Sequence, residues 1–126
     1  MALTGARLLL VDKSAYVRGA GLLTRRQELC LCAVTRLELL FSARSRDDFM
    51  ALEEELAAFR DLRMDAATFA TARGAQRDLA ASGQHRLPIP DLLIAACAQQ
   101  HGAAVVHVDR HFEVLAGVLG FEALRL

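Results

Sequence analysis

The chain has 126 residues, of which 54% are hydrophobic, with 15 basic residues, 15 acidic residues and only two prolines. This length fits one domain covering residues 1–126, and the composition excludes a disordered arm or a low-complexity linker. Balanced charge gives no overall basic field for nucleic acid, and 6% aromatic residues without tryptophan argue against a platform for stacking bases.

Strand and helix patterns alternate along the chain. The expected elements, in chain order, are a strand at 7–11, a helix at 14–22, a strand at 28–33, helices at 35–45 and 46–59, a strand at 60–64, a helix at 65–83, a loop at 84–90, a helix at 91–101, a strand at 103–108, a helix at 110–119 and a strand at 121–124. The run RLLLV is apolar on both faces, as in a buried parallel strand. Together these elements predict an α/β fold, a three-layer α/β/α sandwich around a central parallel sheet of four or five strands.

Smaller patterns refine this outline. Cys30 and Cys32 alternate along one apolar run, so we expect both on one face of a strand as buried thiols. Helical spacing gathers Leu37, Leu40 and Phe41 on one apolar face of the helix at 35–45. The first apolar run is too short for a signal sequence or for a membrane span of about 20 residues, which predicts a cytoplasmic protein.

Acidic residues stand where the predicted strands end. Asp12 directly follows the first strand, and Asp109 stands in the same relation to the fourth. Parallel strands bring such positions to one edge of the sheet, and ligands of open sheets bind outside that edge, where strand order reverses. Asp91 starts a predicted helix, and Glu38 lies in another.

Each acid also has a purely structural interpretation. Asp12, Asp91 and Asp109 precede predicted helices, where an aspartate caps free backbone N–H groups for about 1 kcal/mol. Glu38 falls three residues after Thr35, which matches a capping box. Capping alone would account for all four acids.

Convergence at one edge favours a second interpretation. Two like charges 4 Å apart repel by about 1 kcal/mol in water and by about 4 kcal/mol at an effective dielectric near 20. Clustered carboxylates therefore need a cation or protonation, and Mg²⁺ or Mn²⁺ prefers carboxylate oxygens. A cation held in this way can bind a phosphodiester and lower the pKa of its water.

Four stretches carry a family resemblance: LLLVDKSAYVR, TRLELLFSARS, PIPDLLIAACAQQHG and AVVHVDRHFEVLA. Together they resemble the PIN-domain family, and closely the VapC-type toxins of bacterial toxin–antitoxin pairs. The resemblance covers nearly the whole chain. It implies a small α/β/α sandwich with Mg²⁺-dependent endoribonuclease activity, RNA as substrate, a homodimer, and inhibition by a cognate VapB-type antitoxin.

The same resemblance assigns roles to individual residues. The family's four acids correspond to Asp12, Glu38, Asp91 and Asp109. We expect Asp12 and Asp91 to bind the metal directly, and Glu38 and Asp109 to complete the negative cleft through metal-bound waters. The family's hydroxyl residue corresponds to Ser14, which would orient Asp12 or a water.

One position departs from the family's common Asp-x-Asp-Phe pattern, because this chain reads Asp109, Arg110, His111, Phe112. We expect His111 at the rim of the acidic site rather than as a metal ligand, since imidazole is a softer ligand than carboxylate and its cation would repel a metal. His107, Asp109 and His111 would alternatively suggest a zinc site. Alternate residues at a strand end do not stay on one face once a helix begins, which disfavours zinc.

Basic residues next to the acids are candidates to hold RNA phosphates: Lys13, Arg36 and Arg110. The rival to an enzyme is a non-catalytic interaction module that keeps the fold and the caps and binds a partner through an apolar helical surface. A receiver-type signalling domain is disfavoured, because Asp12 has no paired acid and no acceptor aspartate follows the third strand.

Overall fold

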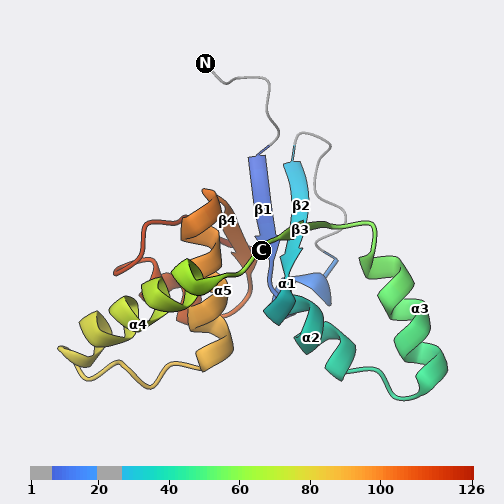
Figure 1. The fold of residues 1–126 in the computed structure, drawn as a ribbon, viewed down its shortest axis with the longest axis horizontal. Coiled ribbons are helices and arrows are strands. Elements are labelled where there is room, and N and C mark those ends of the chain that lie inside the picture. Colours follow the sequence, from blue (N-terminus) through green and yellow to red (C-terminus); the bar gives the residue numbers. More distant parts are fainter. Residues whose placement is uncertain (1–6, 20–26) are drawn as a thin grey trace.

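The computed structural model describes residues 7–19 and 27–126, which form an open parallel sheet with helices on both faces (Figure 1). The strands are β1 (Arg7–Val11), β2 (Gln27–Cys32), β3 (Arg60–Leu62), β4 (Ala104–His107) and β5 (Ala123–Arg125). They lie in the order β3-β2-β1-β4-β5, and every neighbouring pair is parallel. The predicted α/β sandwich is confirmed.

The helices divide between the two faces of the sheet. They are α1 (Lys13–Tyr16), α2 (Ala33–Phe41), α3 (Arg46–Leu56), α4 (Ala66–Ala80), α5 (Ile89–His101) and α6 (His111–Leu115). Successive strand residues point to opposite faces. Leu9 and Val11 therefore pack with α1, α2 and α3, whereas Leu10 packs with α4, α5 and α6. Each apolar strand residue thus enters one of two cores.

Helix α5 is the most buried of the described helices and contributes many residues to the core that contains Leu10. The five residues 94–98 are each fully buried, as expected of a helix that is apolar all round. The helix begins at Ile89, two residues earlier than predicted, because Pro90 is tolerated in a first turn, where its missing N–H costs nothing. It ends at Gly102 as predicted, with φ 65°. No helix in the described part of the chain is long and apolar enough to span a membrane.

Most other elements also differ from the predicted bounds at one end or both, and α2 covers residues 33–41 rather than 35–45. Helix α1 is a single turn, and the chain turns again at Gly19 with φ 89°, while residues 20–22 of the predicted helix lie outside the described residues. Helix α6 stops at Leu115 and continues as turns, and β5 begins at Ala123 rather than at 121. Helix ends depend on which hydrogen bonds the flanking turns offer, and periodicity does not report these.

The apolar face predicted on α2 divides in the structure: Leu40 packs against the core, whereas Leu37 and Phe41 point away from the sheet. Leu37 is 67% exposed and Phe41 is 86% exposed, whereas Leu39 is buried in the core. Cys30 and Cys32 are both buried in the core on the α5 side, as predicted. The exposed face of α2 therefore remains available to cover or contact something else.

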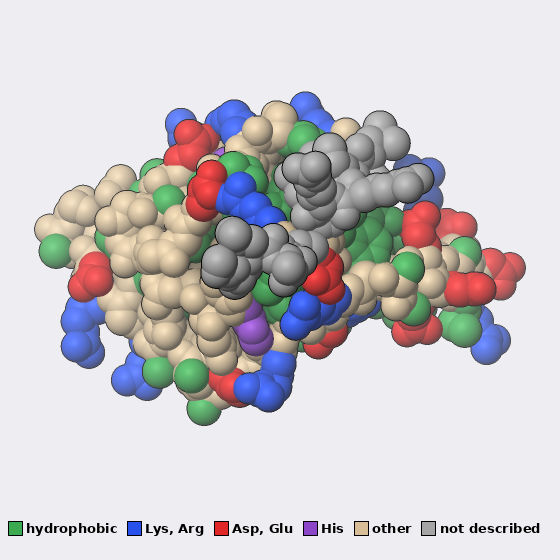
Figure 2. All heavy atoms as spheres, turned by 90° about the horizontal axis from the view of Figure 1, so that it is seen from above, with side chains coloured by type: hydrophobic (Ala, Val, Ile, Leu, Met, Phe, Trp, Pro, Cys, Tyr) green, Lys and Arg blue, Asp and Glu red, His purple; other side chains and the backbone are tan. Residues whose placement is uncertain are grey.

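The amino edge of the sheet mixes charges of both signs. Figure 2 shows this face, seen from above relative to Figure 1, and basic and acidic side chains lie side by side around it. Ion pairs at strand residues belong to this edge: Arg7 with Glu122, and Arg60 with Glu28 at 3.2 Å. Opposite charges therefore neutralise one another here.

Candidate active site

The two central strands carry acids to the opposite, carboxyl edge of the sheet. β1 and β4 are neighbours, with Val11 beside Val106. Strand order reverses between them, because β2 and β3 continue on one side and β5 on the other. Asp12 directly follows β1, and Asp109 follows β4 after one residue. Both acids thus flank the crevice where open parallel sheets bind ligands.

Asp12 is buried, with 5% of its surface exposed, and is held in a defined position. Its backbone N–H donates to Val106 O at 3.0 Å. Its Oδ2 accepts from the Ser14 N–H at 3.0 Å and from the Ser14 hydroxyl at 2.6 Å. The Ser14 hydroxyl oxygen in turn accepts from the Val108 N–H at 3.0 Å. Ser14 therefore ties the end of β1 to the end of β4 and fixes the carboxylate between them.

Asp91 meets His111 and Asp109 across two elements. Asp91 lies in the first turn of α5, only 8% exposed, and His111 begins α6. His111 Nδ1 lies 2.9 Å from Asp91 Oδ2 and 3.0 Å from Asp109 Oδ1. Asp109 Oδ1 also accepts from the His111 backbone N–H at 3.0 Å. One imidazole nitrogen thus joins two carboxylates that are 18 positions apart in the sequence.

Electrostatic interactions connect Glu38 and Asp12 to this group. Partial burial raises the pKa of Glu38, and the carboxylates of Asp12 and Asp91 raise it further. Burial raises the pKa of Asp91 to about 6, with the His111 hydrogen bond opposing and the charges of Asp12 and Asp109 adding to the rise. Asp91 therefore interacts electrostatically with Asp12, Asp109 and Glu38, and so connects the four predicted acids.

Two of the capping interpretations are wrong. Helix α2 begins at Ala33 after Cys32. The Thr35 hydroxyl accepts from the Cys32 N–H and donates to the Cys32 carbonyl, so Glu38 takes no part in a capping box with Thr35. Helix α5 is preceded by Pro88, so Asp91 lies inside the helix and does not cap it. Asp12 does cap α1, and the Asp109 side chain accepts from the first N–H of α6.

The predicted alternative of a zinc site does not form. His107 is fully buried, and its Nδ1 accepts from the Asp109 backbone N–H at 3.1 Å. Its Nε2 has no hydrogen-bond partner among the described residues, and its ring packs 5.3 Å from that of Phe112. Burial lowers the pKa of His107. His107 supports the turn beneath Asp109, whereas His111 alone faces the acids.

The guanidinium of Arg36, a candidate for phosphate binding, has partners within the chain instead. Its Nη1 donates to Leu56 O at 2.9 Å, its Nη2 to Phe59 O at 3.0 Å, and its Nε to Asp61 at 3.2 Å. The guanidinium is therefore occupied in joining the end of α3 to β3. Arg36 lies close to Glu38 in the sequence because both residues belong to α2.

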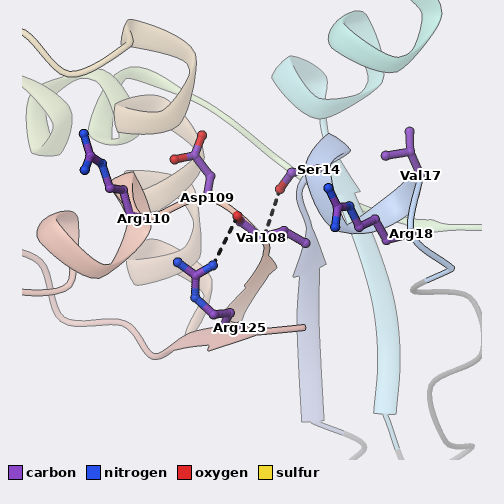
Figure 3. Close-up of a pocket in the computed structure, with 7 residues that line it drawn as sticks. All are labelled: Ser14, Val17, Arg18, Val108, Asp109, Arg110 and Arg125. Atoms are coloured by element: carbon purple, nitrogen blue, oxygen red, sulfur yellow. Dashed lines mark hydrogen bonds between the residues drawn. The ribbon is translucent and has the colours of Figure 1, made fainter.

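Two hollows flank the acids. One, of about 390 Å³, is lined by Lys13, Leu37, Glu38 and Phe41. The other, of about 460 Å³, we call the arginine hollow, and it is lined by Ser14, Val17, Arg18, Val108, Asp109, Arg110 and Arg125. Arg18 reaches it from the side of α1, and Arg110 and Arg125 lie on the opposite side (Figure 3). Arg110 directly follows Asp109 in the sequence, and both residues line this hollow.

Sequence reasoning missed Arg18 and Arg125. Arg18 ends the stretch LLLVDKSAYVR, so a signal existed in the first motif. Arg125 carries no such signal, because only the pairing of β5 with β4 brings it to Val108, whose carbonyl it contacts at 3.3 Å. The contact of His111 with Asp91 likewise could not be predicted from the sequence, because it joins two different helices.

The donor set fits a hard divalent cation. Ligand atoms of Asp91, Asp109 and His111 lie within 4.8 Å of one another. Carboxylate oxygens suit Mg²⁺ and Mn²⁺, and a cation would offset both the burial and the like-charge repulsion that raise the pKa of Asp91. Asp12 acts on this group through its charge, and its pairing with Asp91 as a direct ligand stays a prediction.

Comparisons with known proteins agree with this geometry. A family model described as PIN domain matches residues 8–118. Ribonuclease VapC17 of Mycobacterium tuberculosis (strain ATCC 25618 / H37Rv) is 41% identical, covering 93% of this chain and 94% of that protein. The crystal structure of VapBC-5, a toxin–antitoxin system from Mycobacterium tuberculosis, matches with a TM-score of 0.76 and 26% identity, covering 95% and 99% of the two chains. DNA-bound VapBC from Salmonella typhimurium matches in fold, with a TM-score of 0.74 at 18% identity and coverage of 95% and 98%.

A parallel sheet whose central strands end in acids, together with these matches, defines the class. The chain belongs to the PIN-domain family. Within that family its curated relatives are named as VapC ribonucleases, which confirms the resemblance in the four sequence motifs.

Proposed function

We propose that this protein is a metal-dependent endoribonuclease and the toxin of a toxin–antitoxin pair. The observation that carries the proposal is the meeting of Asp12, Glu38, Asp91 and Asp109 at the switch point of the sheet. Relatives named as ribonucleases, matched over nearly their whole length, supply the reaction class. Divalent metal dependence follows from the family and from the carboxylate-rich donor set.

The proposed cofactor is Mg²⁺ or Mn²⁺, with Asp12 and Asp91 as direct ligands and Glu38 and Asp109 completing the negative site. When bound, such a cation lowers the pKa of coordinated water and stabilises charge on a phosphodiester. Ser14 holds Asp12 in place through its hydroxyl, so the carboxylate needs no reorganisation when substrate arrives. The proposed place of His111 is the rim of the site, with its Nδ1 in contact with Asp91 and Asp109.

The proposed partners are an RNA substrate, a second copy of the chain and a VapB-type antitoxin. The hollow with Leu37 and Phe41 joins exposed apolar side chains directly to Glu38. An antitoxin segment with an apolar face would cover this strip and the acids together, which would block the site. A cellular RNA substrate places the reaction in the cytoplasm, which we propose as its location.

The rival function is a non-catalytic interaction module in which the acids are only caps. Asp12 and Asp109 cap helices, but Asp91 and Glu38 do not. Asp91 is moreover buried close to other carboxylates. A carboxylate whose pKa is raised by burial, and further by neighbouring charges, carries a free-energy cost that a capping role would not explain. This observation favours the enzyme.

Cleavage of a panel of structured RNAs in Mg²⁺, in Mn²⁺ and in EDTA tests the proposal. Asp12→Asn keeps a helix cap and removes the charge, so cleavage should fall at least about 100-fold while the protein stays folded. Asp78→Asn, an exposed acid of α4 that lines neither hollow beside the acids, is the matched control and should cleave normally. Metal-independent cleavage, or wild-type activity in Asp12→Asn, would contradict the proposal.

A further inference from the structure

The arginine hollow adjoins the acids and shares two residues with them. Ser14, which holds Asp12, and Asp109 both line it. Any chain-like substrate positioned at the acids must continue into a neighbouring hollow. The arginine hollow therefore lies on the path of a polymer that is cut at this site.

Its charge differs from that of the rest of the molecule. Formal charges balance over the whole chain, yet three guanidinium groups face one carboxylate here. Glu113 pairs with Arg125 at 2.9 Å and holds it in position. Arg18 and Arg110 form no ion pair with any residue that the structure describes, in contrast to the paired arginines at the amino edge.

Guanidinium groups recognise phosphate oxygens in bidentate geometry. The acids themselves repel phosphates, so the phosphates that flank the reacting one need cationic contacts from outside the acidic site. The other hollow offers one lysine beside Glu38 and two apolar side chains, which suits phosphate poorly. Of the two hollows, only the arginine hollow has an excess of cationic groups.

We propose that the arginine hollow is a phosphate subsite, in which Arg18 and Arg110 bind the RNA backbone next to the phosphodiester that is cut. The subsite rests on the proposed ribonuclease function and extends it to two residues outside the acidic set. Backbone contacts of this kind position a substrate and carry no base specificity. Arg18 and Arg110 are therefore positioning residues for substrate.

The test compares Arg18→Gln, Arg110→Gln and the double variant with wild type and with Arg46→Gln, an exposed arginine at the start of α3 that lines neither hollow. Fluorescence anisotropy of a labelled single-stranded RNA in EDTA gives Kd as a function of salt. Each lost phosphate contact should flatten the slope of log Kd against log salt by about 0.7, so the double variant should lose about 1.4. Steady-state cleavage in Mg²⁺ should show the loss as a rise in KM of about tenfold for each variant.

Several outcomes separate this subsite from the proposed function. Equal Kd, salt slope and KM in the double variant and Arg46→Gln would overturn the subsite while leaving a ribonuclease intact. Weaker binding of an acidic antitoxin peptide with unchanged RNA binding would overturn it in favour of a protein contact. Absence of cleavage by wild type would refute the ribonuclease, and the salt slope in EDTA would still decide whether the two arginines contact phosphate.

Discussion

At the scale of single residues, Asp91 combines burial with the like charges of two neighbouring carboxylates. It is 8% exposed, its only described hydrogen-bond partner is His111, and Asp12 and Asp109 both raise its pKa. Its place was predictable as a motif residue, but its contact with His111 was not. That contact joins α5 to α6, and no periodicity within either helix reports it.

Replacing single acids by asparagine separates stability from catalysis. Asp91→Asn and Asp109→Asn should each retain or gain stability in EDTA, because like-charge repulsion is relieved while a polar side chain remains. Cleavage should fall at least about 100-fold, the scale of one electrostatic catalytic group. Thermal melts in EDTA and cleavage rates in Mg²⁺ measure the two effects, and a variant that melts and cuts like wild type would refute the site.

The pH dependence of stability should carry the signature of Asp91. Its pKa is raised to about 6, so the folded chain holds this proton more tightly than the unfolded chain does. The stabilising contribution is complete below the ordinary aspartate pKa of about 4 and is lost as pH rises through about 6. In EDTA, wild type should therefore lose on the order of 2 kcal/mol relative to Asp91→Asn between these limits. Melting temperatures of both proteins from pH 4 to 8 check this, and parallel curves would contradict it.

His111→Asp tests the departure from the family pattern. A carboxylate at this position adds negative charge beside Asp91 and Asp109, so stability in EDTA should fall while Mg²⁺ affinity rises by about tenfold. Cleavage should be preserved or raised. Calorimetric titration with Mg²⁺ measures the affinity, and His85→Asp, in an exposed loop, is the control. Loss of activity in His111→Asp would place this residue inside the reaction rather than at its rim.

At the scale of secondary structure, the elements that position the acids were predictable, and the surfaces between them were not. Apolar runs identify β1 and β4, and parallel pairing then dictates that Asp12 and Asp109 share an edge. Helix α2 illustrates the limit. Its spacing groups Leu37 with Phe41, but only the packed neighbours decide that Leu39 enters the core instead.

Arg36 is predicted to be structural. Its guanidinium satisfies two carbonyls at the end of α3, so Arg36→Gln should destabilise the fold by about 1 to 3 kcal/mol. The salt dependence of RNA binding should not change, because the side chain faces Leu56 and Phe59 and not the acids. Urea unfolding and anisotropy measure the two quantities. A flatter salt slope without loss of stability would restore Arg36 as a phosphate ligand.

At the scale of the whole molecule, two surfaces stand out. The carboxyl edge of the sheet carries clustered acids and arginines, and the adjoining face of α2 carries exposed apolar side chains. The amino edge pairs its charges, whereas the carboxyl edge concentrates acids beside arginines (Figures 2 and 3). Strand order β3-β2-β1-β4-β5 creates this asymmetry. The alternation of predicted strands and helices indicates a parallel sheet, but it does not determine this order. Which partner covers which helix does not follow from one chain.

Exposed apolar residues predict association in two ways. Light scattering at tens of micromolar should give a dimer, and a strict monomer would count against the homodimer.

Phe41→Ser should weaken capture of the cognate antitoxin at least tenfold, since this side chain is 86% exposed beside Glu38. Arg46→Gln provides the matched surface control, and unchanged capture by Phe41→Ser would exclude α2 as the docking strip.

The buried imidazole of His107 has a spectroscopic consequence. Because its Nδ1 accepts the Asp109 N–H, the ring proton must reside on Nε2, which fixes a single tautomer. Nε2 is shielded from solvent and without a partner among the described residues, so this proton should exchange slowly with water and give an observable ring N–H resonance in the nitrogen-edited NMR spectrum. The turn that carries Asp109 rests on the same bond. That one resonance would therefore report, without any substrate or metal, whether the floor of the active site is intact in each variant.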